Sequence, residues 1–528
     1  MQTAERPTAT DPRPARLRPP LPLSLLVVAV PAIVGAVRLL IALPRPFLAG
    51  GDAAFMELAI RRALGFHQLL GPYSRFAWNH PGPMLFYLFA PLYWLSGRRS
   101  RSLFLGAWLL NAGCAIAAVA VIRHRLGEGA ARVVAALLAL FLVATSFHDL
   151  INPWNPSLLG VPFLLLVVLG ADAGGGSVAS LIGAAAVGTY LVQTHVGMLP
   201  VVGVTLALAA GGWAVSQRRS PDAVDPQRRR RALLGGALIL AVLWAGPAID
   251  QFTGSPGNAG KIVRFFGNPA GETTSHSLRD AAVAVAKAAT RPFGGLGVDH
   301  HPLAGLVGTG LLGCLVAVAA RRRSPFAARL GALGAVNVAL AVASTTRVVG
   351  DLYPYLFEWT PALLFPPVAA AGLAGHDFAR QLARTHTPPR RVLGALGAAA
   401  VVIVVAVGAR FVTATTDSGT VSFEDSPAAT PAARLIEDHV GHDRRRVFQI
   451  HIVDGTFQTA SLLLRLERDG YRFQVTPPYG LYEGSTDRPV DAAVPMVVVG
   501  TELSVLPAGA EPLGTVGPLV LRTVSRLS

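Results

Sequence analysis

The chain has 528 residues, of which 52% are hydrophobic and only 14% are charged, and its mean hydropathy is +0.48. Soluble domains carry about 25% charged residues, so this composition excludes a soluble globular protein, a disordered chain and a disulfide-rich scaffold. It is typical of a polytopic membrane protein. The net charge of +16 comes from 46 basic and 30 acidic residues, and nearly all the basic ones are Arg between apolar runs. That pattern is typical of cytoplasmic loops at an anionic membrane surface and argues against nucleic-acid binding.

Apolar runs of about 17 to 22 residues can cross a bilayer as helices. The sequence predicts eleven such spans, at residues 21–43, 103–122, 132–147, 156–171, 177–193, 197–215, 232–249, 303–320, 327–345, 355–374 and 392–412. The expected fold is therefore an all-α transmembrane domain over residues 21–412, preceded by a basic cytoplasmic tail at 1–20. Cys114 and Cys314 both lie inside apolar runs, so neither a disulfide nor a metal site is expected from them.

The basic loops set the orientation of the spans, because cytoplasmic loops carry an excess of Lys and Arg. Six Arg lie within 217–231, three at 321–323 and four within 380–391. All three loops are cytoplasmic only if a further apolar stretch, 82–97, does not cross the membrane. We expect that stretch to lie in or dip into the outer interface.

Three regions on the outer side are long enough to build structure: residues 44–102, 250–302 and 413–528. The second contains an amphipathic helix candidate at 277–291. The third has short β-like apolar segments and one helical segment, which predict a small extracytoplasmic α/β domain. The predicted strands are 447–453, 494–499 and 519–524, and the predicted helix is 457–469.

The first outer loop carries the most distinctive residues. Asp52 follows Gly50-Gly51 and precedes an amphipathic helix that we expect to lie flat on the membrane. Its carboxylate can cap that helix, and this structural role alone accounts for the residue. The following segment, 71–87, is rich in aromatic and polar residues, which is more typical of a pocket for a polar substrate than of a connector. Its candidate binding residues are Arg75, Asn79 and His80.

An Asp just after the first span, a flat helix and then His80-Pro81-Gly82-Pro83 before an apolar stretch resemble the GT-C superfamily of membrane glycosyltransferases. The similarity is to the protein O-mannosyltransferase and aminoarabinose transferase families. It covers roughly residues 20–200. The resemblance implies transfer of a sugar from a polyprenyl-phosphate carrier at the outer face of the membrane, with inversion at the anomeric carbon.

The resemblance also assigns roles to residues of this loop. Asp52 matches the catalytic acidic residue of the family, which takes the proton of the acceptor hydroxyl. The family usually has an acidic pair here, whereas this chain has Ala53 and its next acid is Glu57. Glu57 is therefore a second catalytic candidate, and the departure leaves a divalent metal possible but unsupported.

The leaving group in this chemistry is a lipid phosphate, which needs cations at the interface. Arg98, Arg99 and Arg101 precede a span on the outer side, where the family carries an Arg that contacts the phosphate. Guanidinium geometry suits phosphate oxygens. The alternative is a simple topology anchor, although it then lies on the side that the positive-inside rule disfavours.

The second outer loop and the end of the fifth span supply further candidates. Asp149 matches a second acidic residue of the family, and Asn152 and Asn155 are candidates for binding sugar hydroxyls. Asn-Pro pairs are also ordinary turn signals, so loop structure explains the two Asn equally well. Gln193 and His195 lie in an apolar context, where polar groups must be paired or functional. A buried His bonded to a neighbouring helix remains the alternative for His195.

Late in the chain, Arg347 and Tyr353 lie at another outer span end and are candidates for phosphate and substrate binding. Arg347 and Asp351 can also form a local ion pair. A metal site at Asp299, His300 and His301 is disfavoured, because three adjacent side chains cannot easily face one ion. No cofactor is assigned.

The leading hypothesis is a polyprenyl-phosphate-sugar-dependent glycosyltransferase, a hexosyl- or pentosyltransferase, that acts on a cell-envelope glycan, lipid or protein. A transporter or flippase of lipid-linked sugar needs polar residues near mid-span, and here they gather at outer span ends. A catalytically inactive binding or scaffold protein remains a third hypothesis because the acidic pair is missing. The abundance of Ala, Arg, Gly and Pro indicates a high-GC bacterium, so the expected location is the bacterial plasma membrane.

Overall fold

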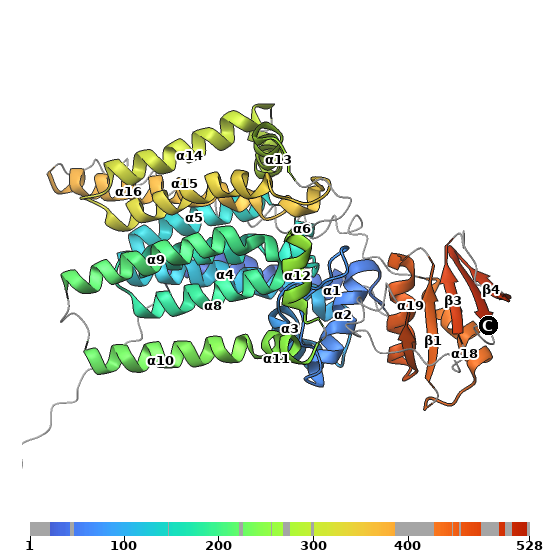
Figure 1. Ribbon diagram of the computed structural model, residues 1–528. Helices are drawn as coiled ribbons and strands as arrows, with labels where there is room; N and C mark the ends of the chain where they lie inside the picture. Colours follow the sequence, from blue (N-terminus) through green and yellow to red (C-terminus); the bar gives the residue numbers. More distant parts are fainter. Residues whose placement is uncertain are drawn as a thin grey trace, which may run out of the picture.

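The computed structural model describes a helical bundle, a set of helices across one end of it, and an α/β domain beyond that end (Figure 1). The predicted basic tail and the predicted eleventh span at 392–412 lie outside the described residues. The described residues are 22–42, 47–145, 147–220, 225–254, 256–267, 275–296, 300–385, 427–445, 447–453, 456–476, 496–501 and 509–524.

The bundle helices coincide with ten of the predicted spans. They are α1 (Leu23–Ala42), α4 (Arg101–Leu126), α5 (Glu128–Ala144), α7 (Gly160–Ala173), α8 (Val178–Thr194), α9 (Leu199–Arg219), α10 (Pro226–Leu243), α14 (Pro302–Ala319), α15 (Pro325–Thr345) and α16 (Phe365–Thr385). Seven helical segments among the described residues are long and apolar enough to cross a membrane. An eighth is added if α10 and the following α11 (Ala245–Thr253), bent by 46°, form one span. The prediction of a polytopic, mostly helical membrane protein is confirmed.

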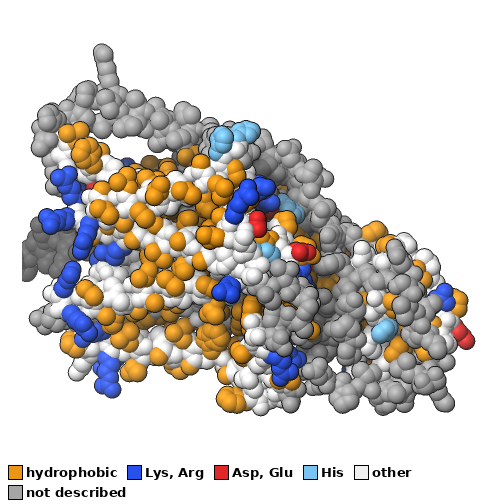
Figure 2. Space-filling view, turned by 45° about the horizontal axis from the view of Figure 1, so that its top comes forward, with side chains coloured by type: hydrophobic (Ala, Val, Ile, Leu, Met, Phe, Trp, Pro, Cys, Tyr) orange, Lys and Arg blue, Asp and Glu red, His pale blue; other side chains and the backbone are white. Residues whose placement is uncertain are grey.

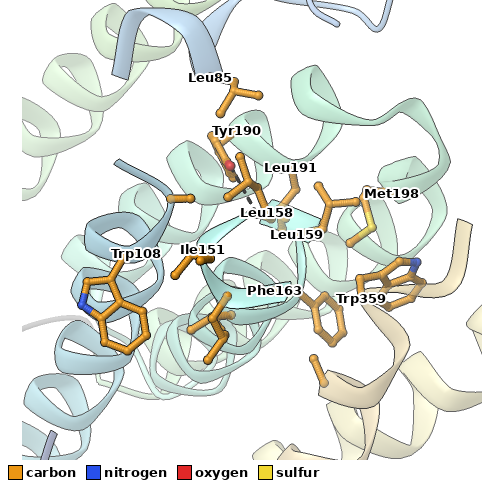
Figure 3. Packing of buried hydrophobic residues seen from close by; sticks show 14 of the residues in the cluster. Leu85, Trp108, Ile151, Leu158, Leu159, Phe163, Tyr190, Leu191, Met198 and Trp359 are labelled. Carbon is orange, nitrogen blue, oxygen red and sulfur yellow. Dashed lines mark hydrogen bonds between the residues drawn. The ribbon is translucent and has the colours of Figure 1, made fainter. Parts of the chain in front are cut away.

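The centre of the bundle is α7, whose residues from Val161 to Ala173 are all buried. A helix that is apolar all round is expected at such a position. Figure 3 shows its N-terminal end, where Phe163 meets Trp359 edge to face with ring centroids 5.2 Å apart. The Tyr190 hydroxyl donates a hydrogen bond to the Leu158 carbonyl at 3.2 Å, so α8 is tied to the turn before α7.

Shorter helices lie at the end of the bundle that faces the C-terminal domain, and Figure 1 shows α12 running across the bundle axis there. They are α2 (Gly51–Leu64), α3 (Met84–Leu95), α6 (Phe147–Ile151), α11, α12 (Asn258–Gly267), α13 (Leu278–Thr290) and the 3-10 helices η1 (Asn155–Leu158), η2 (Val196–Met198), η4 (Arg291–Leu296), η6 (Pro354–Phe357) and η7 (Thr360–Leu364). At about 1.5 Å per residue, α3 is roughly 18 Å long, whereas the hydrocarbon core is about 30 Å thick. This length supports the prediction that 82–97 does not cross the membrane.

The C-terminal domain has the predicted α/β class. Its elements are α18 (Ala429–Val440), β1 (Val447–Ile452), α19 (Thr456–Arg468), β2 (Arg472–Val475), β3 (Met496–Gly500), β4 (Glu511–Val516) and β5 (Leu519–Val524). The sheet order is β2-β1-β3-β5-β4. β1 is parallel to β2 and β3, while β5 is antiparallel to β3 and β4. The three strands and the helix that the apolar pattern predicts are confirmed, and α18, β2 and β4 are additional.

Basic side chains gather at the end of the bundle that is farthest from the C-terminal domain. An apolar band lies between that end and the domain (Figure 2). The last turn of α4 carries Arg123 and Arg125, the last turn of α9 carries Arg218 and Arg219, and α10 begins with a run of Arg. The fold therefore separates a strongly basic end from the end that carries the C-terminal domain.

Close approach between α14 and α15 depends on two glycines. A Cβ added at Gly313 would lie 2.7 Å from the Gly331 carbonyl oxygen, and one added at Gly331 would lie 2.8 Å from the Gly313 carbonyl oxygen. In membranes, helices associate largely through such close packing of small residues.

We expect Gly313→Val to separate α14 from α15 and to destabilise the protein by about 1–3 kcal/mol, because the new side chain overlaps the backbone of the facing helix. The measurement is thermal unfolding of the purified protein in detergent. Gly308→Val is the matched control, since a Cβ at Gly308 on the same helix meets nothing within 4 Å. An equal loss of stability in both variants contradicts the packing role of Gly313.

Candidate active site

Asp52 lies in the first turn of α2, and the residue before the helix is Gly50, which makes no side-chain cap. The expectation that Asp52 caps the helix is therefore wrong. The reason is Gly51, whose φ of 49° turns the chain into the helix one residue before Asp52. A carboxylate in the first helical turn is still favourable, because the helix dipole is positive there.

Aromatic and cationic side chains lie around Asp52. Tyr355 is within electrostatic range of both Asp52 and Arg75. The Arg75 guanidinium lies over the Tyr353 ring, 4.5 Å from its centroid. Tyr353 and Tyr355 are stacked with centroids 5.8 Å apart, and Trp154 is 5.2 Å from Tyr355. Residues from four separate parts of the chain are therefore linked through Tyr355, which is in electrostatic range of Asp52 in the first turn of α2.

A second group of charges adjoins this one through Trp154 and Ser157. The Arg291 guanidinium lies 3.6 Å from the Asp149 carboxylate. The Ser157 hydroxyl donates to Glu358 Oε2 at 2.5 Å, and Glu358 is in electrostatic range of Asp149 and Arg291. Burial raises the pKa of Asp149, and the nearby Arg291 and His148 oppose that rise in part.

Together these side chains form what we call the outer site. Its members are Asp52, Arg75, Asp149, Trp154, Ser157, Arg291, Tyr353, Tyr355 and Glu358. It combines carboxylates that can accept protons, a guanidinium that can bind an anion, and aromatic faces beside them. Of the predicted candidates, the structure thus brings together Asp52, Arg75, Asp149 and Tyr353.

His80 and His195 form a separate pair next to this region. Their ring centroids are 4.5 Å apart, and His80 Nδ1 accepts a hydrogen bond from the Val196 backbone at 3.2 Å. Burial lowers the pKa of His80 well below its usual value, and His195 adds to this effect. Burial also lowers the pKa of His195 to about 4. Both imidazoles are therefore neutral near pH 7.

The side-chain amides of three predicted ligands, Asn79, Asn155 and Gln193, form hydrogen bonds to backbone groups. Asn79 is buried, donates to the Gly71 carbonyl at 3.2 Å and exchanges hydrogen bonds with Asn258 of α12. Asn155 donates to the Thr194 carbonyl at 3.1 Å. The fully buried Gln193 accepts from the Met84 amide and donates to the Leu243 carbonyl, so it joins α8, α3 and α10.

Asn152 and Tyr353 make local contacts. Asn152 Oδ1 accepts a hydrogen bond from the Trp154 amide at 3.0 Å. This contact is typical of a turn, which agrees with the structural interpretation of the Asn-Pro pattern. The Tyr353 hydroxyl donates to Asp351 at 3.3 Å, and the neighbouring Arg347 is exposed. A substrate role for these residues stays a prediction.

Glu57 is buried away from solvent, and both of its carboxylate oxygens accept hydrogen bonds. The donors are Tyr93, Ser100 and Arg468. These contacts favour a positioning role over the catalytic role expected for Glu57 from the sequence. Arg98 and Arg99 are exposed in the turn before α4, and Arg101 begins that helix.

Several residues that contact the predicted site residues were not identified from the sequence. Arg291 pairs with Asp149 across 142 residues of chain, and α12 packs Phe265 against Phe76 and Trp78. The strongly amphipathic sequence of α12 was the available signal for that helix. Among the described residues, no group of three or more His, Cys, Asp and Glu is arranged to hold a metal ion, and Asp299 lies outside them.

No protein-family model and no curated protein matches the chain. Solved structures do match. The crystal structure of ArnT from Cupriavidus metallidurans bound to undecaprenyl phosphate is similar with a TM-score of 0.56 and 15% sequence identity, over 94% of this chain and 97% of that one. The same protein in the apo state matches with a TM-score of 0.52 and 15% identity, over 94% and 98% of the two chains. The chain therefore shares the overall fold of ArnT, as the predicted resemblance to the aminoarabinose transferase family implies.

The loop that carries the predicted binding residues folds as a tight hairpin, with Gly71 hydrogen-bonded to His80 at 3.0 Å. A Cβ at Gly71 would lie 2.6 Å from the carbonyl oxygens of Gln193 and Gly82, both of them backbone atoms. Only a residue without a side chain fits there.

We expect Gly71→Ala to destabilise the protein by about 1–3 kcal/mol, because backbone carbonyls must move to make room for the methyl group. Thermal unfolding in detergent measures the loss. The control is Gly113→Ala in α4, where a Cβ meets nothing within 4 Å and Ala is the better helix former. Unchanged stability in Gly71→Ala is the result that contradicts this packing.

Proposed function

We propose that this protein is a glycosyltransferase that moves a sugar from a polyprenyl-phosphate carrier to a cell-envelope acceptor at the membrane end that bears the C-terminal domain. The observation that carries the proposal is the outer site, in which Tyr355 lies within electrostatic range of both Asp52 and Arg75 and stacks on Tyr353. The matching ArnT structure is bound to undecaprenyl phosphate, which supports a lipid-phosphate carrier for this fold.

Asp52 is the proposed general base. An acceptor hydroxyl has a pKa far above 7, so a positioned carboxylate must take its proton as the anomeric carbon is attacked. The carrier phosphate leaves as an anion, and guanidinium groups stabilise that charge. Arg75 lies at the site. Arg98 and Arg99 lie in the turn before α4 and Arg101 is the first residue of α4, and Ser100 links this segment to Glu57 of α2. One-step displacement with inversion needs no covalent enzyme intermediate.

The structure favours this chemistry over transport. The aromatic and charged residues of the outer site come from loops and helix ends, and the buried Asp172 and Asp250 lie at the end of α7 and within the short α11. A transporter is expected to place its polar site near mid-membrane between broken helices.

We also propose that the basic end of the bundle is cytoplasmic and that the C-terminal domain lies outside the cytoplasm of a bacterial cell. The positive-inside rule supports this orientation, because the Arg clusters and the C-terminal domain are at opposite ends. The outer site then faces the cell envelope, where a lipid-linked donor and a glycan, lipid or protein acceptor can meet.

The test of the catalytic proposal is sugar transfer by purified protein from a panel of polyprenyl-phosphate pentoses and hexoses to envelope acceptors. We expect Asp52→Asn to lower kcat by about 10²–10⁴-fold, because the amide cannot accept the proton. Asp225→Asn is the matched control, since Asp225 caps α10 at the basic end and Asn caps equally well.

Each outcome of this assay has a defined meaning. Transfer that survives in Asp52→Asn rejects Asp52 as the base and directs the same test to Asp149. Carrier binding without turnover in the wild-type protein rejects the enzyme and favours a binding or scaffold protein. Carrier movement across vesicle membranes without sugar transfer favours a flippase.

The orientation is tested separately with single added cysteines. We expect a membrane-impermeant maleimide to label Arg472→Cys, exposed in β2, in cells whose outer envelope is permeabilised and whose plasma membrane is intact. Ser220→Cys, exposed after α9, should be labelled only after the plasma membrane is broken. The wild-type protein, with its helical Cys114 and Cys314, gives the background. The reverse labelling pattern rejects the proposed orientation.

A further inference from the structure

The C-terminal domain is held against the membrane domain by two ion pairs between α19 and α2. Arg468 pairs with Glu57, and Arg61 pairs with Glu467, with Nε and Oε1 2.6 Å apart in the second pair. Each helix supplies one acid and one base, so the two pairs fix both the position and the direction of α19 on α2. α2 is the helix whose first turn carries Asp52.

The first pair contacts Ser100 directly, whereas the second reaches Glu57 only through Tyr93, to whose hydroxyl Arg61 Nη1 donates at 3.3 Å. Arg468 Nε donates to Glu57 Oε1 at 3.0 Å, and Arg468 Nη2 donates to the Ser100 hydroxyl at 2.7 Å. Ser100 in turn donates to Glu57 Oε2 at 2.5 Å. The Tyr93 hydroxyl donates to Glu57 Oε1 at 2.7 Å. Glu57 and Ser100 are both 0% exposed, so these contacts form without competing water.

Ser100 carries the network to the start of α2. Its oxygen accepts a third contact, from the backbone amide of Ala49 at 3.0 Å. A Ser hydroxyl has one donor and two acceptor positions, and here all three are in use. Ala49 precedes the Gly50-Gly51 turn that sets the direction of the chain at Asp52. Ser100 also lies between Arg99 and Arg101. The same hydroxyl therefore fixes the segment that carries Arg98, Arg99 and Arg101, which we call the arginine turn.

We propose that Glu57, Ser100 and Arg468 are positioning residues through which the C-terminal domain holds the start of α2 and the arginine turn in their working geometry. The role of that geometry in sugar transfer rests on the proposed function; the coupling of the domain to the two segments does not. A carboxylate base and a phosphate-binding turn must keep a fixed position relative to each other, because a displacement of about 1 Å can lower the rate roughly 10²-fold. The network joins both segments to one guanidinium that lies 411 residues from Glu57 in the chain.

The adjacent ion pair provides the matched control. Arg468→Gln and Glu467→Gln each remove one charge from neighbouring positions of α19, and both weaken the docking of the domain. Only Arg468 contacts Ser100. Positioning therefore predicts different effects of the two variants on the start of α2, whereas docking alone predicts equal effects.

The first measurement is hydrogen–deuterium exchange of the full-length protein in detergent, which requires no knowledge of the substrate. We expect amides of residues 47–56 and 96–102 to exchange faster in Arg468→Gln than in Glu467→Gln or the wild type. Equal exchange of these segments in the two variants overturns the proposal. If Arg468→Gln does not fold, Ser100→Ala decides, because it keeps the Arg468–Glu57 ion pair and removes the three contacts of the Ser100 hydroxyl, with Glu57, Arg468 and Ala49.

The second measurement is the sugar-transfer assay. We expect Arg468→Gln and Ser100→Ala to lower kcat by about 10²-fold, with donor KM changed by less than about threefold, and Glu467→Gln to stay near the wild type. Equal kcat in Arg468→Gln and Glu467→Gln overturns the catalytic consequence of positioning. If the wild-type protein transfers no sugar, the proposed function fails, and the exchange data alone decide whether the domain positions these segments.

Discussion

The arrangement of the bundle end that bears the C-terminal domain depends on how the buried carboxylate of Glu57 is paired. A charge removed from water is stable only when it is paired and its oxygens accept hydrogen bonds. The membrane domain supplies Tyr93 and Ser100, but the compensating cation comes from Arg468 in the C-terminal domain. The ion pair between Glu57 and Arg468 therefore joins the C-terminal domain to the membrane domain. It does so on α2, the helix whose first turn carries Asp52.

The same requirement governs the other polar groups near the membrane. Gln193 bridges three helices, Asn79 and Asn258 satisfy each other, and Asn155 binds the backbone at the end of α8. Unpaired polar groups are costly in a low-dielectric setting, so these amides hold the loops in one conformation. Arg75 belongs to the hairpin that Asn79 closes through its hydrogen bonds to Gly71 and Asn258. Several residues that resemble ligands in the sequence thus stabilise the loops of this region through hydrogen bonds to the backbone.

The two ends of the bundle have different chemistry, and that difference underlies the proposed function. One end is a basic surface suited to anionic lipid headgroups. The other combines carboxylates, aromatic rings and guanidinium groups with a docked α/β domain. A one-sided distribution suits a reaction that occurs at one face of the membrane, with a lipid-anchored donor arriving from within the bilayer plane. Over nearly the whole of both chains the fold is similar to that of ArnT, whose crystal structure was solved bound to undecaprenyl phosphate.

The helices and strands whose signal is local could be predicted from the amino-acid sequence alone. Apolar length predicted the bundle helices, and alternating and helical periodicities predicted β1, β3, β5 and α19, because each pattern reflects the surroundings of its own segment. The sequence also placed Asp52 at the start of a helix, although the helix begins at Gly51 and its N-cap is Gly50, two residues before the cap predicted at Asp52. Contacts between residues that are distant in the sequence became evident only in the folded protein. Asp149 with Arg291, Tyr355 with Asp52, and Glu57 with Arg468 are partners because separate elements dock at one end of the bundle. Pairing across hundreds of residues leaves no periodic trace in a single chain, and this is why Glu57 resembles a catalytic acid in the sequence and has the contacts of a positioning residue in the fold.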